Sequence, residues 1–171
     1  MTKSYPRSFP MDVWPRAADA EDPWRRRRPV ILVAEDNAAD REWLRRALAQ
    51  MSENCDVRMV EDGVDLLGYL RMAAMSSDRR ANPAPDLMIV DMKMPRKDGC
   101  QALADIAREF ELTTPIVIFS GSDDPADIEA CYRAGCSSYV TKPIDLRRFN
   151  RVVHMIACYW LRLSRIPAPS L

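Results

Sequence analysis

Short runs of apolar residues alternate along the chain with longer segments in which apolar side chains recur every three or four positions. The short runs are typical of buried strands, and the longer segments are typical of amphipathic helices. Strands are predicted at residues 30–34, 56–60, 86–91, 115–120 and 137–140. Helices are predicted after the first strand, around Trp43, Leu44 and Ala47, and then at 63–75, 100–110, 125–135 and 145–163. Asp40 is available to cap the first helix, and Gly135 to end the fourth.

The strict alternation of strands and helices predicts the architecture. Continuously apolar strands indicate a parallel sheet that is covered by helices on both faces. Five such units suggest a flavodoxin-like α/β fold, a doubly wound five-stranded parallel sheet in the order 2-1-3-4-5. Ligands of such sheets bind beyond the carboxyl ends of the strands, where the first and third strands lie side by side.

The predicted domain covers residues 30–163, and the flanking segments differ from it in composition. Residues 1–29 are rich in proline and charge, which favours a flexible N-terminal extension. A docking peptide is the alternative, because Trp14 and Trp24 stand there in a polar setting. Residues 164–171 are expected to form a C-terminal tail, which leaves no room for a DNA-binding output domain.

Charge and hydropathy argue against nucleic acid and membranes as partners. The 25 lysine and arginine residues balance the 25 aspartate and glutamate residues, so no net field attracts either. The basic run at residues 25–28 is expected to be a solvated boundary before the first strand. No apolar run reaches the roughly 18 residues that a membrane span needs.

The cysteines and the N-terminus bear on the compartment. The five cysteines are scattered and form no C-x-x-C pair, so neither a disulfide framework nor a zinc site is indicated. They are Cys55, Cys100, Cys131, Cys136 and Cys158. Prolines interrupt the region where a signal peptide would lie, so a reduced, cytoplasmic protein is expected.

The first and third predicted strands both end in carboxylates. Glu35 and Asp36 follow the first strand, and Asp91 ends the third. Because these strands are neighbours in the expected order, the three carboxylates should converge and repel one another. A magnesium ion, which prefers carboxylate oxygens, would neutralise them.

Two further polar residues should reach the same crevice. Lys142 follows the fifth strand and precedes Pro143, which restricts it to extended geometry; the bond between them is a candidate for the cis form. Its compact ammonium group suits a phosphate oxygen. Ser120 ends the fourth strand, where its hydroxyl can donate to an anion or, alternatively, cap the fourth helix.

Taken together, these positions resemble the receiver domain of two-component response regulators. The resemblance covers about Val30 to Leu163, and "DMKMPRKDG" is similar to the stretch that follows the phosphorylated aspartate of that family. The matched positions are the acidic pair Glu35/Asp36, Asp91, Ser120, Tyr139 and Lys142–Pro143. The long loop before the third strand, "PRKDG" and the aromatic end of the last helix look most like single-domain regulators paired with bacterial phytochromes.

The resemblance implies a role for each matched residue. Asp91 would accept the phosphoryl group, and Mg²⁺ would be held by Glu35, Asp36, Asp91 and the backbone carbonyl of Lys93. Lys142 would neutralise phosphoryl oxygens and would contact Asp91 before phosphorylation. Glu35 departs from the family, which more often has aspartate there, as does Ser120, where threonine is common.

The implied activity is signalling rather than enzymatic turnover. A sensor histidine kinase, with a bacteriophytochrome as one candidate, would supply the phosphoryl group, and the protein would promote its own phosphorylation and dephosphorylation. Ser120 and Tyr139 would then turn inward and remodel the face built by the fourth helix, fifth strand and fifth helix. Simple packing is the alternative role for Tyr139.

The last helix carries a wider apolar arc than one sheet-facing stripe requires. We expect a homodimer through its end, with Tyr159, Trp160 and Leu161 as anchors. The alternative is that this arc serves packing only. His154 is expected on the polar, solvent-exposed side of this helix.

Other functions remain open on the sequence. A haloacid-dehalogenase-like phosphatase also uses a nucleophilic aspartate and Mg²⁺, but its D-x-D motif requires an acid where Lys93 stands. A receiver-like binding module that is not phosphorylated would retain the same residues. A nucleotide-binding domain would need a glycine-rich phosphate loop, and "AEDNAAD" contains no glycine.

Overall fold

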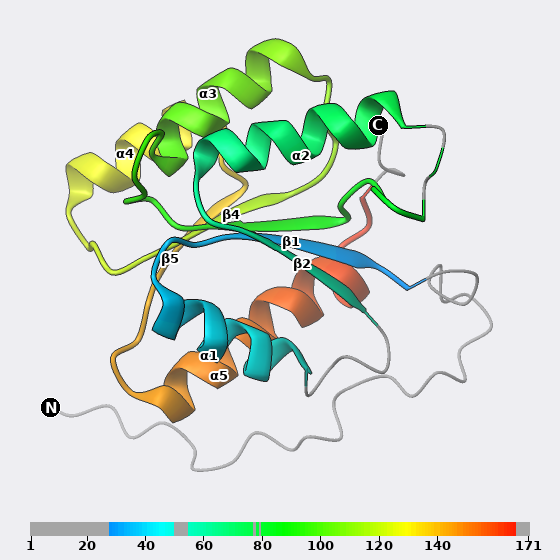
Figure 1. The fold of residues 1–171 in the computed structure, drawn as a ribbon. Coiled ribbons are helices and arrows are strands. Elements are labelled where there is room, and N and C mark those ends of the chain that lie inside the picture. Colours follow the sequence, from blue (N-terminus) through cyan, green and yellow to red (C-terminus); the bar gives the residue numbers. More distant parts are fainter. Residues whose placement is uncertain (1–27, 50–54, 77, 79, 167–171) are drawn as a thin grey trace, which may run out of the picture.

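The computed structural model of the chain describes residues 28–49, 55–76, 78 and 80–166. The expected N-terminal extension lies outside these residues except for its last two positions, and the expected tail lies outside them from residue 167. One parallel sheet runs through the described part in the order β2-β1-β3-β4-β5, which confirms the predicted fold (Figure 1). Its strands are β1 (Val30–Ala34), β2 (Asp56–Val60), β3 (Leu87–Val90), β4 (Ile116–Ser120) and β5 (Ser138–Thr141).

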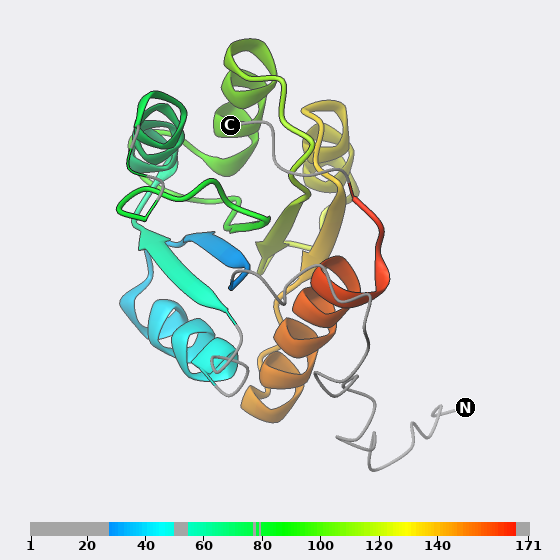
Figure 2. The same ribbon diagram turned by 90° about the vertical axis from the view of Figure 1, so that its right-hand side faces the viewer.

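Helices cover both faces of the sheet (Figures 1 and 2). They are α1 (Ala38–Ala49), α2 (Gly63–Met75), α3 (Gly99–Glu109), α4 (Pro125–Arg133) and α5 (Leu146–Cys158), which continues into the π-helical turn η3 (Tyr159–Leu163). Helices α1 and α5 pack together on one face, and α2, α3 and α4 lie side by side on the other. Among the described helices, none has the length and apolar character required to cross a bilayer.

The strands contribute side chains to two separate hydrophobic cores, one on each face of the sheet. In β1, Ile31 and Val33 point toward α1 and α5, whereas Leu32 and Ala34 point toward α2 and α3. Successive strand residues face opposite sides, so both sets are buried and β1 is apolar without interruption. The apolar runs in the sequence therefore reflect a sheet with no solvated face.

Polar side chains start the helices, with one difference from expectation. Asn37, not Asp40, caps α1, since its side-chain oxygen accepts hydrogen bonds from the backbone N–H groups of Ala39 and Asp40. Asp40 lies inside the first turn of α1 instead, and its carboxylate pairs with Lys142. Gly135 follows α4 with a φ of 100°, a left-handed conformation that glycine adopts without a steric penalty.

The end of the last helix differs from the predicted continuous α-helix. Its final turn is π-helical, closed by a hydrogen bond from the N–H of Ser164 to the carbonyl of Tyr159 at 2.7 Å. The wider turn shifts the apolar face of the helix. As a result Leu161 is buried, whereas Leu163 is 65% exposed. The expectation that Leu161 anchors a dimer is therefore wrong for this conformation, since its side chain belongs to the core of its own chain.

Two other local expectations were wrong for related reasons. His154 is partly buried, and its Nε2 donates to the carbonyl of Ala47 at 2.7 Å, so it joins α5 to α1 rather than facing solvent. Cys100 and Cys131 form a disulfide, although their sequence spacing indicated none. Both contacts join helices that are distant in sequence, and no local pattern encodes such pairs.

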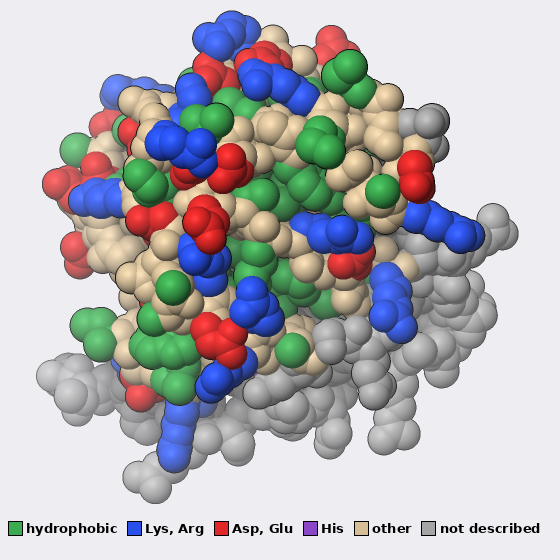
Figure 3. All heavy atoms as spheres, in the orientation of Figure 1, with side chains coloured by type: hydrophobic (Ala, Val, Ile, Leu, Met, Phe, Trp, Pro, Cys, Tyr) green, Lys and Arg blue, Asp and Glu red, His purple; other side chains and the backbone are tan. Residues whose placement is uncertain are grey.

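Charged side chains of both signs are interspersed over the face shown in Figure 3, and neither sign gathers into a patch there. This agrees with the balanced charge of the sequence.

The loop between β3 and α3 (residues 91–98) folds tightly against the end of β3. The N–H of Gly99 donates to the carbonyl of Met92 at 2.8 Å. A Cβ at Gly99 would lie 3.1 Å from the Cα of Met92 and still closer to the carbonyl oxygen of Asp91. Only a residue without a side chain allows this approach.

Gly99→Ala should therefore lower the free energy of unfolding by about 1–3 kcal/mol, the usual cost of overpacking. Gly68→Ala is a matched control, because a Cβ at Gly68 meets nothing within 4 Å. In the interior of α2 it should raise stability by about 0.5–1 kcal/mol. Urea unfolding of both variants measures the difference, and equal effects would contradict the close approach.

Candidate functional site

Three carboxylates meet where β1 and β3 end. Oxygen atoms of Glu35, Asp36 and Asp91 lie within 4.8 Å of one another. The pairing of Ala34 with Val90 places the following residues at the same level, and the N–H of Asp91 donates to the carbonyl of Ala34 at 2.8 Å. Glu35 and Asp91 are buried, whereas Asp36 is exposed. The structure thus brings together the acidic residues that the sequence placed on separate strands.

Lys142 extends its ammonium group into this cluster. Its Nζ lies 2.6 Å from Glu35, 2.7 Å from Asp91 and 2.9 Å from Asp40. The backbone N–H of Lys142 donates to the carbonyl of Ser120 at 2.6 Å, which fixes the start of the side chain beside the end of β4. One ammonium therefore compensates carboxylates from β1, α1 and β3.

Asp40 was missed as a site residue because it was assigned to the helix cap. It lies in the first turn of α1, only a few residues after Glu35 and Asp36. Its closeness in sequence to the acidic pair was the signal that could have identified it.

The bond before Pro143 was a candidate for the cis form, but it is trans, since no peptide bond among the described residues is cis. A trans bond is the ordinary form even before proline, where cis costs about 0.5–1 kcal/mol in the absence of specific contacts.

Burial and charge perturb both central groups. Burial raises the pKa of Glu35 to about 7, against the hydrogen bond and the charge of Lys142, which act to lower it. Burial acts to lower the pKa of Lys142, but the hydrogen bonds to Asp91 and Glu35 outweigh this effect and raise it. Lys142 therefore stays charged, and the carboxylates around it exceed its single positive charge.

Neighbouring residues hold the acidic pair in place. The guanidinium of Arg41 donates to the carbonyls of Glu35 and Asp36 at 2.8 and 2.6 Å. The N–H of Asn37 donates to the Glu35 carboxylate at 3.2 Å. These contacts orient the backbone after β1 so that both carboxylates turn toward β3.

The β3–α3 loop is anchored at both ends. At Asp91, the backbone N–H of Lys93 donates to the carboxylate at 2.8 Å. Farther along, Arg96 has a φ of 57° and forms ion pairs with Asp62 and Asp65 at the start of α2. Asp62 is buried; although burial acts to raise its pKa, hydrogen bonds from backbone N–H groups and Arg96 lower it. Arg96 and Asp62 were not anticipated, because their contact spans 34 residues.

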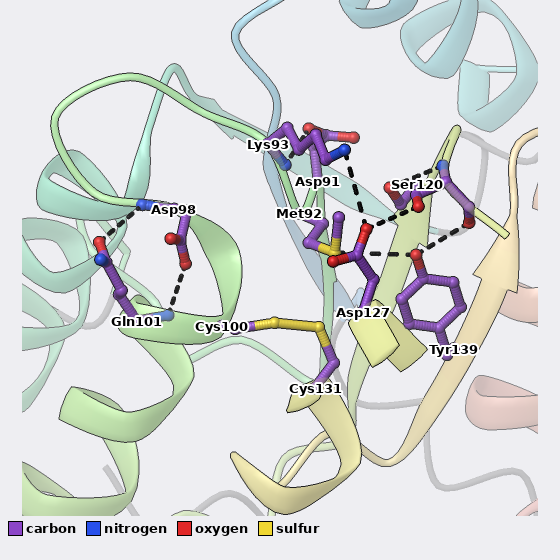
Figure 4. The surroundings of a disulfide bond; sticks show 11 residues. Asp91, Met92, Lys93, Asp98, Cys100, Gln101, Ser120, Asp127, Cys131 and Tyr139 are labelled. Atoms are coloured by element: carbon purple, nitrogen blue, oxygen red, sulfur yellow. Dashed lines mark hydrogen bonds and ion pairs between the residues drawn. A yellow bond between two sulfur atoms is a disulfide. The ribbon is translucent and has the colours of Figure 1, made fainter. Parts of the chain in front are cut away.

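Ser120 and Tyr139 lie on the other side of Asp91, next to the loop between β4 and α4 (residues 121–124; Figure 4). Ser120 is buried, and its hydroxyl accepts a hydrogen bond from the N–H of Ser122 at 3.2 Å. Asp124 caps α4, so the alternative cap role for Ser120 is wrong. The Tyr139 hydroxyl donates to the Ser122 carbonyl at 2.9 Å.

The cluster fits a hard divalent cation. Its ligands are all oxygen atoms, and the exposed Asp36 gives access from solvent. Mg²⁺ and Mn²⁺ both favour carboxylate and carbonyl oxygens over the nitrogen and sulfur ligands that zinc prefers.

Comparison with known proteins decides the family. The family model for the response regulator receiver domain matches residues 31–154. The chain belongs to the response regulator receiver family. Receiver domains serve two-component signalling and bind Mg²⁺ or Mn²⁺ in an acidic pocket, and the residues described above form such a pocket here.

Relatives of this receiver domain include regulators of similar length. It is 29% identical over 153 residues to the probable methanogenesis regulatory protein FilR2 of Methanothrix harundinacea, covering 89% of this chain and 93% of that protein. It is 28% identical over 140 residues to the response regulator Rcp1 of Synechocystis sp., covering 81% of this chain and 93% of Rcp1.

Solved structures give the same fold. The phosphorylated cyanobacterial phytochrome response regulator RcpA is 32% identical, with a TM-score of 0.73, over 82% of this chain and 99% of RcpA. The Mn²⁺-bound form of Rcp1 is 28% identical, with a TM-score of 0.71, over 82% of this chain and 99% of Rcp1. The receiver domain therefore resembles phytochrome-associated regulators, as its sequence suggested.

Replacing Lys142 by glutamine should lower the free energy of unfolding by about 3–5 kcal/mol, because it leaves buried carboxylates without their counter-charge. MgCl₂ should restore part of the loss, since a cation that binds only the folded state stabilises it. Urea unfolding with and without MgCl₂ measures both effects.

Arg133→Gln provides the control for the lysine variant. It removes an exposed ion pair with Glu129 one turn away on α4. Such pairs contribute about 0.2–0.5 kcal/mol. A loss of similar size in both variants would contradict the central role of Lys142.

Proposed function

We propose that this chain is a response regulator that accepts a phosphoryl group from a sensor histidine kinase on Asp91. The observation that carries the proposal is the contact between the Lys142 ammonium and the Asp91 carboxylate. This contact lies beside the acidic pair, where β1 and β3 end. Its function is signalling rather than turnover of a substrate.

The transfer requires a positioned nucleophile and neutralised charge. An oxygen of Asp91 attacks the phosphorus of the phosphohistidine, the P–N bond breaks, and the leaving imidazole takes up a proton. The N–H of Lys93 and the ammonium of Lys142 each contact one oxygen of Asp91 and so fix its orientation. Phosphoryl transfer depends mainly on such positioning and electrostatic stabilisation.

We propose Mg²⁺ as the cofactor, held by Glu35, Asp36, Asp91 and the backbone carbonyl of Lys93. The ion supplies positive charge that lets the negatively charged nucleophile and the phosphoryl group approach each other. The Mn²⁺-bound form of Rcp1 supports a divalent cation at a pocket of this kind.

Ser122 connects the phosphoryl site to the signalling face of α4, β5 and α5. Its N–H donates to the Ser120 hydroxyl, its carbonyl accepts from Tyr139, and its hydroxyl donates to Asp127 of α4 at 2.6 Å. When Ser120 turns to a phosphoryl oxygen, the first contact is lost and the other two transmit the displacement. Phosphorylation shifts this equilibrium because the added charge contacts Ser120 and Lys142 differently in the two states.

The partner proposed for this regulator is a bacteriophytochrome histidine kinase, in the cytoplasm. The resemblance to RcpA, a phytochrome response regulator, supports the class of kinase. Neither nucleic acid nor a membrane surface is part of the proposal, because the sequence carries no net charge.

A homodimer through the end of the last helix also remains a proposal. Tyr159 is 52% exposed and Leu163 is 65% exposed, and Trp160 packs edge-on against Tyr159. The proposed anchors are therefore Tyr159, Trp160 and Leu163. Leu161, which the sequence suggested, is excluded because it is buried.

Asp91 should be phosphorylated by acetyl phosphate in the presence of Mg²⁺. Intact-protein mass spectrometry should show the addition of one phosphoryl group to the wild type, and none to Asp91→Asn or to the wild type with EDTA. Asp123→Asn is the matched control, since Asp123 is an exposed aspartate of the β4–α4 loop and should leave the modification unchanged.

The same experiment separates the alternatives. Rapid multiple turnover of an aryl phosphate would indicate a phosphatase instead. Absence of both phosphorylation and any response to beryllofluoride with Mg²⁺ would indicate a binding module that is not phosphorylated.

Light scattering at micromolar protein should give twice the 19.5 kDa mass of one chain. Tyr159→Ser should shift the mass toward that of the monomer, because it removes an exposed aromatic anchor. Tyr132→Ser is the control, since Tyr132 is similarly exposed, at 50%, but lies on α4. A wild-type monomer would contradict the proposed interface.

A further inference from the structure

The Cys100–Cys131 disulfide joins α3 and α4, which lie on the same face of the sheet. Cys100 is the second residue of α3, and Cys131 lies in α4, with their Cα atoms 5.2 Å apart (Figure 4). The two cysteines are separated by 31 positions in the sequence, and the packing of α3 against α4 brings them together. The crosslink therefore restrains α4 relative to α3.

Both ends of this crosslink lie close to parts of the phosphoryl site. Cys100 directly follows Gly99, whose N–H donates to the carbonyl of Met92, the residue after Asp91. Cys131 lies one turn beyond Asp127, which accepts from Ser122 and pairs with Lys93 at 3.7 Å. The disulfide thus bridges the loop that carries Asp91 and the helix through which the signal is proposed to leave.

The surroundings favour reversible chemistry at this pair over the other cysteines. Cys100 is partly exposed, whereas Cys131 is fully buried, so Cys100 is the end of the disulfide nearer to solvent. Cys55 and Cys136 are buried and Cys158 is partly buried. Burial raises the pKa of all three thiols, which keeps them protonated and poorly reactive.

We propose that Cys100 and Cys131 form a reversible redox crosslink that controls the phosphorylation switch, an inference that rests on the function proposed above. The closed disulfide holds α4 against α3 and opposes the displacement that Ser122 transmits. The reduced pair leaves α4 free to move. The oxidation state thereby sets how strongly phosphorylation changes the signalling face.

The redox step involves two electrons. On closing, the two thiols are oxidised by a peroxide: one S–S bond forms, the O–O bond breaks, and the two thiol protons end in two water molecules. On opening, a thiolate of a dithiol reductant attacks the Cys100 sulfur, and Cys131 leaves as a thiolate that takes up a proton. The second thiol of the reductant then attacks the mixed disulfide, which forms a disulfide within the reductant and releases Cys100 as a thiolate that takes up a proton.

The thiol state is tested first on the full chain. After hydrogen peroxide treatment, alkylation under denaturing conditions should label three of the five cysteines, those at 55, 136 and 158, and after dithiothreitol all five. Peptide mass spectrometry should identify the Cys100–Cys131 pair. Five labelled thiols after peroxide, or a different pairing, would overturn the proposal.

The coupling is tested by hydrogen–deuterium exchange of residues 125–133 during a titration with beryllofluoride and Mg²⁺. The oxidised protein should need about fivefold or more beryllofluoride to reach the same change in exchange of α4. A factor of about five is at the lower end of the range for allosteric coupling between two sites. Cys100→Ser should respond like the reduced wild type under both conditions. Cys158→Ser is the matched control, because it removes a cysteine outside the pair and should retain the redox dependence.

The outcomes separate this inference from the function on which it rests. An equal response of the oxidised and reduced wild type would overturn the redox control and leave the phosphorylation proposal intact. A reduced wild type that neither responds to beryllofluoride nor accepts phosphate from acetyl phosphate would overturn the proposed function itself.

Discussion

The contact on which the site depends is the single ammonium of Lys142 among the carboxylates of Glu35, Asp40 and Asp91. Like charges held this close in a partly dry crevice repel strongly unless a cation lies between them. Lys142 can fill that place only because β5 pairs with β4, and β4 with β3, so that the end of β5 faces the same crevice. The strand order is thus a precondition for the electrostatics.

The two loops beside Asp91 differ in how firmly they are held. The β3–α3 loop is constrained by the close approach of Gly99 and by the ion pairs of Arg96 with α2. The β4–α4 loop is held by the hydrogen bonds of Ser122, which a turn of Ser120 would break or redirect. A fixed Asp91 next to a loop with exchangeable contacts suits the phosphorylation switch proposed above. The disulfide links these two regions, which is why its oxidation state bears on the switch.

The last helix shows how one irregular turn changes a surface. A regular α-helix would have carried the sheet-facing side onward to Leu163. The π-helical turn at Tyr159–Leu163 buries Leu161 instead and exposes Leu163. The set of residues available to a second chain therefore depends on backbone geometry that apolar periodicity does not report.

The sequence by itself determined the architecture and the outline of the site. Alternating apolar runs and amphipathic segments specify the strands and helices, because burial on one or two faces imposes its period directly on the residues. The strand order then placed Glu35, Asp36 and Asp91 at one edge, and the motif around Lys142 identified the counter-charge.

Tertiary structure alone decided the contacts between segments that no local pattern relates. The pairing of Cys100 with Cys131, the bond of His154 to Ala47 and the ion pair of Arg96 with Asp62 each follow from how the elements pack. Asp40 is an intermediate case. Its closeness in sequence to the acidic pair was visible, whereas its partner Lys142 lies 102 residues away. Local sequence encodes which face of a helix or strand is buried. Which side chain of another element it contacts depends on how whole helices and strands are placed relative to one another.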